Sequence, residues 1–166
     1  MATVEDKRAL LAELLAELDA ELERSTRQAK DAAEGATHED NRAEGDKDMR
    51  STEASYVARG QAARVADIEE ARRKLAALDL EELGEAPTVR AAAIVTVEHA
   101  GRRATYFIVP AAGGRRLSGA RVGAPEVTTL ATTSPLGRAL LGLGPGDEAE
   151  VATAQGVRAH AVVAVT

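Results

Sequence analysis

The chain has 166 residues, 45% of them apolar and 29% charged, which fits a folded protein of one ordinary domain or two small ones and excludes a disordered chain. Only 2% of the residues are aromatic and none is cysteine, so we expect no aromatic-walled pocket, no disulfide and no cysteine-based metal site. Residues 1–80 hold 13 basic and 19 acidic groups, whereas residues 81–166 are balanced. An acidic half is unsuited to binding duplex nucleic acid, because phosphates attract cations.

The sequence also indicates the cellular compartment. Charges interrupt the first 14 residues, so no signal peptide is expected, and no apolar run reaches the length of a membrane span. The absence of cysteine fits a reducing environment. We therefore expect a cytoplasmic protein without membrane contact.

The first predicted element is a long helix over residues 3–35. Thr3 is its expected N-cap, Glu5 and Asp6 suit the positive end of the helix dipole, and Gly35 is its expected C-terminal cap. Small and apolar side chains then recur, after a first step of seven residues, at alternating steps of four and three residues, which is typical of a coiled-coil seam. The predicted seam consists of Val4, Leu11, Leu15, Leu18, Leu22, Ser25, Ala29, Ala32 and Ala36.

An acidic turn is expected at residues 36–50, before a second helix that begins at Ser51 or Thr52 and ends near Leu80. The second helix has an apolar stripe of its own, made of Val57, Val65, Ile68, Leu75 and Leu78. Two helical patterns of matching length predict an antiparallel hairpin over residues 1–82 with the turn as its tip. The carboxylates in and beside this turn are Glu39, Asp40, Glu44, Asp46, Asp48 and Glu53. A monomer is expected, since the second helix supplies the seam partner, although a self-pairing arm is an alternative.

A linker at residues 83–88 contains Gly84 and Pro87, and after it the apolar pattern changes to a period of two. Strands are expected at residues 89–98, 103–110, 125–132, 148–152 and 157–165. Ser134 as N-cap, Pro135 as first helical residue and Gly142 as stop predict a short helix at 135–141. The fold class is therefore α+β, with a helical hairpin followed by a small antiparallel β domain at 89–166.

Two stretches together resemble a known family. The run TSPLGRALLG at residues 133–142, followed by Gly146 and Asp147, resembles the signature SPxGxxLxGxxxGD of the Gre-type transcript cleavage factors of bacterial RNA polymerase. Gly45 and Asp46 within the acidic turn, with Tyr56 in the second helix, resemble the hairpin tip of that family. The resemblance covers essentially the whole chain in the same order.

The resemblance implies an FKBP-like C-terminal domain that docks at the rim of the polymerase secondary channel, with Ser134, Pro135, Gly137 and Arg138 as candidate partner-binding residues. It also implies that acids of the tip help the polymerase to hold a catalytic Mg²⁺, so that the polymerase cleaves the 3′ end of backtracked RNA. The candidate tip acids here are Asp46, Asp48 and Glu44. Such a chain is not itself an enzyme, has no metal or cofactor of its own, and meets nascent RNA only indirectly.

The tip departs from the family pattern, which reads Gly-Asp-x-x-Glu-Asn-x-x-Tyr. Three extra residues separate Gly45 from Tyr56. Aligned from Gly45, the aspartate position is Asp46 but the glutamate position is Met49, and aligned from Tyr56, the two acidic positions fall on Met49 and Thr52. Neither register keeps both acids. An alternative is therefore a Gre-like paralogue that occupies the channel and modulates pausing or initiation without stimulating cleavage.

A further alternative is a prolyl isomerase or chaperone, which the FKBP-like fold suggests but the scarcity of aromatic residues disfavours. The three histidines, His38, His99 and His160, are isolated in sequence and do not show the spacing of metal ligands. We therefore expect no metal site from them.

Overall fold

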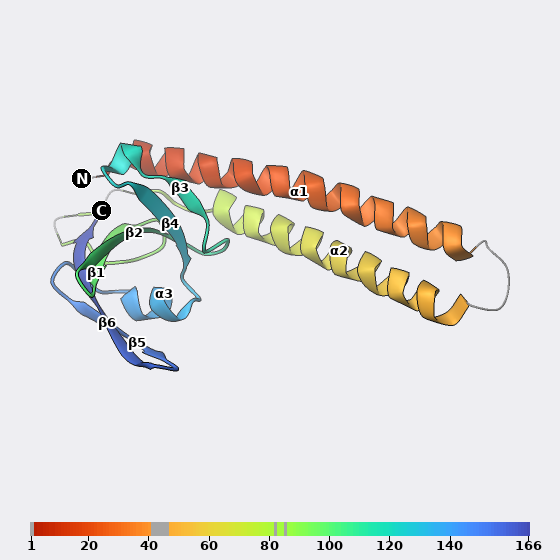
Figure 1. Ribbon diagram of the computed structural model, residues 1–166. Helices are drawn as coiled ribbons and strands as arrows, with labels where there is room; N and C mark the ends of the chain where they lie inside the picture. Colours follow the sequence, from red (N-terminus) through yellow and green to blue (C-terminus); the bar gives the residue numbers. More distant parts are fainter. Residues whose placement is uncertain (1, 41–46, 82, 85) are drawn as a thin grey trace. The chain divides into compact units, whose positions relative to one another are not determined.

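The structure is a computed structural model that describes residues 2–40, 47–81, 83–84 and 86–166, with side chains described outside 36–40, 47–52 and 54. It divides into two compact units: Ala16–Arg73 form one, and Met1–Leu15 with Lys74–Thr166 form the other. In chain order, the elements are α1 (Val4–Asp40), α2 (Lys47–Ala76), β1 (Ile94–His99), β2 (Arg102–Val109), β3 (Arg116–Ser118), the 3-10 turn η1 (Ala120–Val122), β4 (Glu126–Ala131), α3 (Pro135–Leu140), β5 (Glu148–Thr153) and β6 (Gly156–Val165) (Figure 1).

Within residues 16–73, α1 and α2 run side by side as the predicted hairpin (Figure 1). Leu18 and Ser25 of α1 and Ile68 of α2 are buried, as the seam predicts. Two ion pairs also join the helices, Arg64 with Glu21 and Arg72 with Asp19. None of the helices, over the described residues, has an apolar stretch long enough to cross a membrane.

The base of the predicted seam is displaced by one residue. Leu10 and Leu14 are buried, with exposed fractions of 2% and 0%, whereas the predicted Leu11 and Leu15 are only half-buried. Each leucine belongs to a doublet, so the sequence offers two adjacent stripes. Residues 1–15 belong to the same compact unit as Lys74–Thr166, and packing within that unit selects one of the two stripes.

Both helix boundaries at the turn were predicted too far from the tip. Gly35 does not end α1, which continues to Asp40, and α2 begins at Lys47 instead of Ser51 or Thr52. A glycine inside a helix costs only about 1 kcal/mol relative to alanine, which a helix of 37 residues tolerates. The second helix also ends earlier, at Ala76 instead of Leu80.

The C-terminal unit contains a six-stranded sheet with strand order β3-β4-β2-β1-β6-β5. The predicted antiparallel sheet is wrong in one respect, because β2 and β4 pair in parallel from Tyr106 opposite Thr128 to Val109 opposite Ala131. The crossover between them contains β3, which the sequence analysis missed. That strand is only three residues long and has one apolar side chain, Leu117, which is too little for a pattern of period two.

The first strand is also shorter than expected. Residues 89–93 were predicted as its beginning, but Ala91 and Ala92 form a turn, and Ala92 has φ of 68°, outside the range of a strand. The segment before the strand is fixed instead by Val89, whose N–H donates to the Leu143 carbonyl at 2.8 Å.

One face of the sheet packs against the short helix α3. The buried residues of this core are Val89, Ala93, Val95, Val97, Ile108, Leu140, Ala149, Val162 and Val165. Leu140 from α3 is fully buried, and Leu136 packs beside it at the edge of the cluster. Leu141, which follows Leu140 in sequence, does not join this core, because its exposed fraction is 41%. α3 thus covers the sheet with one side, and Leu141, the residue that caps its C-terminus, is exposed.

Candidate functional site

The predicted tip acids lie largely beyond what the structure describes. Glu44 and Asp46 fall outside the described residues. Asp48 is in the first turn of α2, and its side chain is also outside the described set. The proposed grouping of these three carboxylates therefore stays a prediction.

Two neighbouring side chains of α2 are large, apolar and exposed. Tyr56 and Val57 have exposed fractions of 68% and 55%, among the highest of the large apolar side chains described. Val57 was predicted to belong to the apolar stripe of α2, and its exposure contradicts that prediction. Tyrosine is enriched among the residues that dominate binding at protein interfaces, so Tyr56 is a candidate contact residue.

The predicted partner-binding motif begins with a well-formed helix cap. The Ser134 hydroxyl accepts the Gly137 N–H at 3.0 Å and donates to the Ala131 carbonyl at 2.8 Å. Pro135 occupies the first turn of α3, where its missing N–H has no cost. Ser134 and Pro135 thus fix where α3 starts relative to the end of β4.

Gly137 is required by close packing. It is buried, and an ideal Cβ there would lie 2.0 Å from the Ala131 carbonyl oxygen. This approach brings the start of α3 against the end of β4. Arg138, the next residue, is exposed and directs its charge away from the core.

The rest of the motif holds the loop between α3 and β5. Gly142 has φ of 83° and donates to the Val89 carbonyl at 2.8 Å, and Gly146 has φ of 93° and donates to the Val162 carbonyl at 2.8 Å. The Asp147 carboxylate accepts the Gly144 N–H at 2.7 Å. These glycines therefore have backbone roles that other residues would meet only with strain.

The motif consequently separates into two classes of residue. Ser134, Gly137 and the loop glycines build the local structure, whereas Pro135, Arg138 and Leu141 are exposed and available for contact. Of the four predicted partner-binding residues, the geometry makes Arg138 and Pro135 the accessible ones. Leu141, which we had not predicted as a contact residue, adds an apolar group to the same short segment. We call Pro135, Arg138 and Leu141 the α3 surface.

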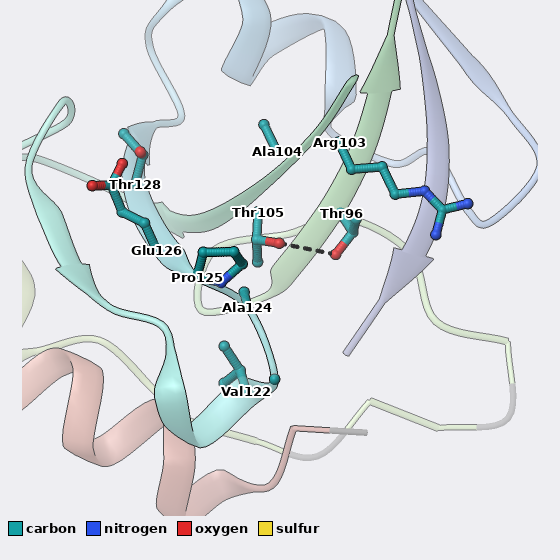
Figure 2. A pocket seen from close by; sticks show the side chains of 10 residues that line it. Thr96, Arg103, Ala104, Thr105, Val122, Ala124, Pro125, Glu126 and Thr128 are labelled. Atoms are coloured by element: carbon teal, nitrogen blue, oxygen red, sulfur yellow. Dashed lines mark hydrogen bonds between the residues drawn. The ribbon is translucent and has the colours of Figure 1, made fainter. Parts of the chain in front are cut away.

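A separate open pocket of about 420 Å³ lies where β2 and β4 diverge (Figure 2). Their parallel pairing begins only at Tyr106 and Thr128, so the preceding part of β2 borders the pocket together with the segment that enters β4. The hydroxyls of Thr96 and Thr105 point toward one another, with their oxygens 3.3 Å apart (Figure 2). The lining is Thr96, Arg103, Ala104, Thr105, Val122, Gly123, Ala124, Pro125, Glu126 and Thr128.

The chemistry of this pocket does not favour catalysis. Its two charged side chains each have a partner, since Arg103 pairs with Glu98 at 3.0 Å and Glu126 lies 3.7 Å from Arg116. Its lining contains no histidine and no aromatic ring, so it lacks the walls expected of a prolyl isomerase. Phe107 is fully buried in the sheet and cannot supply such a wall. Among the described residues, no group of three or more histidine, aspartate or glutamate side chains could hold a metal ion.

Comparison with known proteins gives matches among solved structures alone: no family model and no curated protein matches the chain. GreA factor homolog 1 (Gfh1) of Thermus thermophilus is 23% identical, with 92% of this chain and 94% of that chain covered and a TM-score of 0.37. Gfh1 of Thermus aquaticus is 21% identical, with 90% and 92% covered and a TM-score of 0.37. The elongation factor GreA/GreB of Nitrosomonas europaea is 24% identical, with 60% and 78% covered and a TM-score of 0.37. These are similarities at low identity, and the function proposed below is argued from the residues of this chain.

Proposed function

We propose that this chain is a transcription factor of Gre type, which binds bacterial RNA polymerase and inserts its acidic hairpin tip into the secondary channel. The observation that carries the proposal is the run from Ser134 to Asp147. Its family-like residues each have a specific place in the structure, from the Ser134 cap to the Asp147 carboxylate that binds the Gly144 N–H. We would not expect a chance match to the family signature to give every one of these residues a structural role.

The hairpin supports the same proposal. Two helices of 37 and 30 residues are joined through an acidic segment, and Tyr56 and Val57 stand exposed beyond it. Carboxylate oxygens are hard ligands that suit Mg²⁺, and a second metal can stabilise the attacking and leaving oxygens of phosphoryl chemistry. The chain would lend Asp46, Asp48 and Glu44 to the Mg²⁺ of the polymerase and would not catalyse by itself. It would act in the cytoplasm as a monomer and meet the RNA 3′ end only inside the polymerase.

The proposed domain organisation is a hairpin over residues 1–82, a linker at 83–88 and a β domain at 89–166. In this proposal the β domain docks through the α3 surface. Arg138 supplies the charge and Leu141 the apolar contact, and arginine is enriched among the residues that dominate binding at protein interfaces.

Cleavage of stalled, backtracked polymerase complexes tests the tip. We expect the chain to release short 3′ RNA fragments, and the double variant Asp46→Ala with Asp48→Ala to abolish them. Asp67→Ala is the matched control, because Asp67 is an exposed acid of α2 away from the tip. Binding with no fragments from the unaltered chain would establish the alternative, a paralogue that occupies the channel without stimulating cleavage. The altered spacing between Gly45 and Tyr56 favours this alternative.

Binding to the polymerase tests the anchor separately. Arg138→Ala is expected to weaken binding by roughly fivefold to tenfold, since loss of a central interface arginine costs more than about 1 kcal/mol. Arg121→Ala, an exposed arginine of η1, should leave affinity unchanged. A chain that does not bind polymerase at all would overturn the proposal.

A further inference from the structure

Two histidines that are isolated in sequence lie together in the sheet. The rings of His99 in β1 and His160 in β6 are stacked, with centroids 4.6 Å apart and planes inclined by 29°. The preceding cross-strand pairs, Val97 with Val162 and Glu98 with Ala161, lead directly to this position. The pairing of β1 with β6, and not any sequence spacing, therefore creates the cluster.

The hydrogen bonding of His99 fixes which of its nitrogens is available. Its Nδ1 lies 2.7 Å from the Ala159 carbonyl oxygen, and a carbonyl can only accept, so Nδ1 carries a proton. Nε2 is thus the nitrogen that can gain a proton and donate to a ligand. The ring is held in place while it does so.

Two arginines extend the cluster on the same face. Arg102 of β2 is the cross-strand partner of His99, and Arg158 of β6 is two residues from His160. Side chains directly opposite or two residues apart in a sheet share a face. Both arginines are exposed, and Arg158 also donates to the Gln155 side chain at 2.7 Å. We call Arg102, His99, His160 and Arg158 the Arg–His corner.

The carboxylates of these strands do not neutralise the corner. The acids Glu98, Glu148 and Glu150 lie on the opposite face, because they pair with Arg103, Ala161 and Ala159 respectively. The β5 residues opposite His160 and Arg158 are Ala149 and Val151, which carry no charge.

The neighbouring segments, over the described residues, add one carboxylate and one cation. At the start of β5, the Asp147 carboxylate already accepts the Gly144 N–H at 2.7 Å. The charged residue of α3, which packs on this face, is Arg138, another cation. The described charges around the corner are therefore mainly positive.

We propose that the Arg–His corner binds a ligand with two or more adjacent phosphate groups. Guanidinium forks and imidazole N–H groups are matched donors for phosphate oxygens. The corner extends over β2, β1 and β6, whose neighbours are spaced by about 4.8 Å, so it spans roughly 10 Å. Adjacent phosphates can fill that span, whereas a single carboxylate with two oxygens cannot.

Binding of the phosphates should be coupled to proton uptake. Burial, together with His99 and Arg158 nearby, lowers the pKa of His160. A bound anion would offset the two positive neighbours and raise the pKa again. Affinity for phosphates should therefore increase as pH falls below 6.5 through the lowered pKa of His160.

Titration of the histidine side chains by NMR, on the full chain, tests the proposal without polymerase. Pyrophosphate is compared with potassium chloride at the same ionic strength. We expect pyrophosphate to raise the pKa of His160 by about half a unit or more. Arg102→Gln and Arg158→Gln should each remove at least half of the rise, while Arg116→Gln, an exposed arginine of β3, should leave it intact.

Two further ligands identify the source of the phosphates. A short single-stranded RNA that reproduces the effect of pyrophosphate would assign the corner to nucleic acid, and pyrophosphate alone would assign it to a free di- or triphosphate. A poly-glutamate peptide that raises the pKa of His160 while pyrophosphate does not would overturn the proposal in favour of an acidic protein. The proposal would also be overturned if pyrophosphate and chloride changed the histidine pKa equally. It would be overturned as well if Arg116→Gln reduced the rise as much as Arg102→Gln and Arg158→Gln do. Both results would indicate screening by salt alone.

Discussion

The Cα of Gly137 lies so close to the end of β4 that a Cβ added to it would be 2.0 Å from the Ala131 carbonyl oxygen. The obstructing atom belongs to the backbone at the end of β4, against which α3 packs. Neither the helix nor the strand can therefore shift without disturbing the other. Gly137→Ala should therefore lower the free energy of unfolding by about 3 kcal/mol or more, as severe overpacking does. Urea denaturation followed by circular dichroism measures the change.

Gly60→Ala is the matched control for that substitution. Gly60 is exposed inside α2, and an added Cβ meets no atom within 4 Å. The same chemical change should raise stability there by about 0.5–1 kcal/mol, because alanine is the better helix former. Equal effects at the two sites would show that the contact between Gly137 and Ala131 is not as close as described.

The same segment shows why local signals were predictable. Ser134, Pro135 and Gly142 specify a helix start and stop through atoms within a few residues, and α3 forms where they indicate. The strands after it were predicted nearly to the residue for the same reason: both are bounded by turns with glycine. The exposure of Arg138 and Pro135 follows from that local geometry.

The features that escaped prediction depend on contacts distant in sequence. The parallel pairing of β2 with β4 is a choice of partner that no short pattern encodes. The choice between Leu10 and Leu11 requires knowing what packs on the first turns of α1. His99 and His160 meet only through the register of β1 with β6.

Lys7 provides a test of how α1 is fixed within its own unit. Its exposed fraction is 2%, and its Nζ donates to the Glu81 carbonyl at 3.0 Å. Lys7→Ala removes a buried hydrogen bond and the packing of a long side chain, so stability should fall by about 1–3 kcal/mol.

Arg8→Ala, at the next position, is the control for Lys7. Arg8 pairs with Glu5 at 2.6 Å, but both side chains are well exposed. Exposed pairs contribute less than about 1 kcal/mol, so thermal unfolding should be nearly unchanged. A Lys7→Ala protein as stable as the Arg8→Ala protein would contradict the role given to the Glu81 contact.

The ion pair between Glu21 and Arg64 tests the hairpin. Glu21 is buried, with an exposed fraction of 8%, so removing its arginine weakens the compensation of a desolvated charge. Arg64→Ala should destabilise the hairpin by about 1–2 kcal/mol in urea denaturation. Arg27→Ala, which breaks an exposed pair with Glu23 at 3.0 Å on the same helix, should cost less than about 0.5 kcal/mol. Similar losses of stability in Arg64→Ala and Arg27→Ala would mean that the burial of Glu21 does not strengthen its ion pair.

The pH dependence of stability should reveal His160. Its folded pKa is lowered from 6.5 by burial, then by His99 and Arg158. The unfolded chain thus binds the proton more readily than the folded one. The contribution of neutral His160 to the free energy of unfolding is therefore fully present above pH 6.5. It declines as pH falls from 6.5 through the lowered folded pKa.

The expected loss is small, below about 1 kcal/mol, because His160 is only partly buried and solvent screens its neighbours. Urea midpoints at a series of pH values between about 7.5 and 5 measure it, in a range where most carboxylates remain ionised. His160→Gln should flatten the profile, since glutamine does not titrate. Arg158→Gln should make it shallower, because one of the charges that oppose protonation is gone. A profile with the same slope in His160→Gln as in the unaltered chain would assign the dependence to other groups.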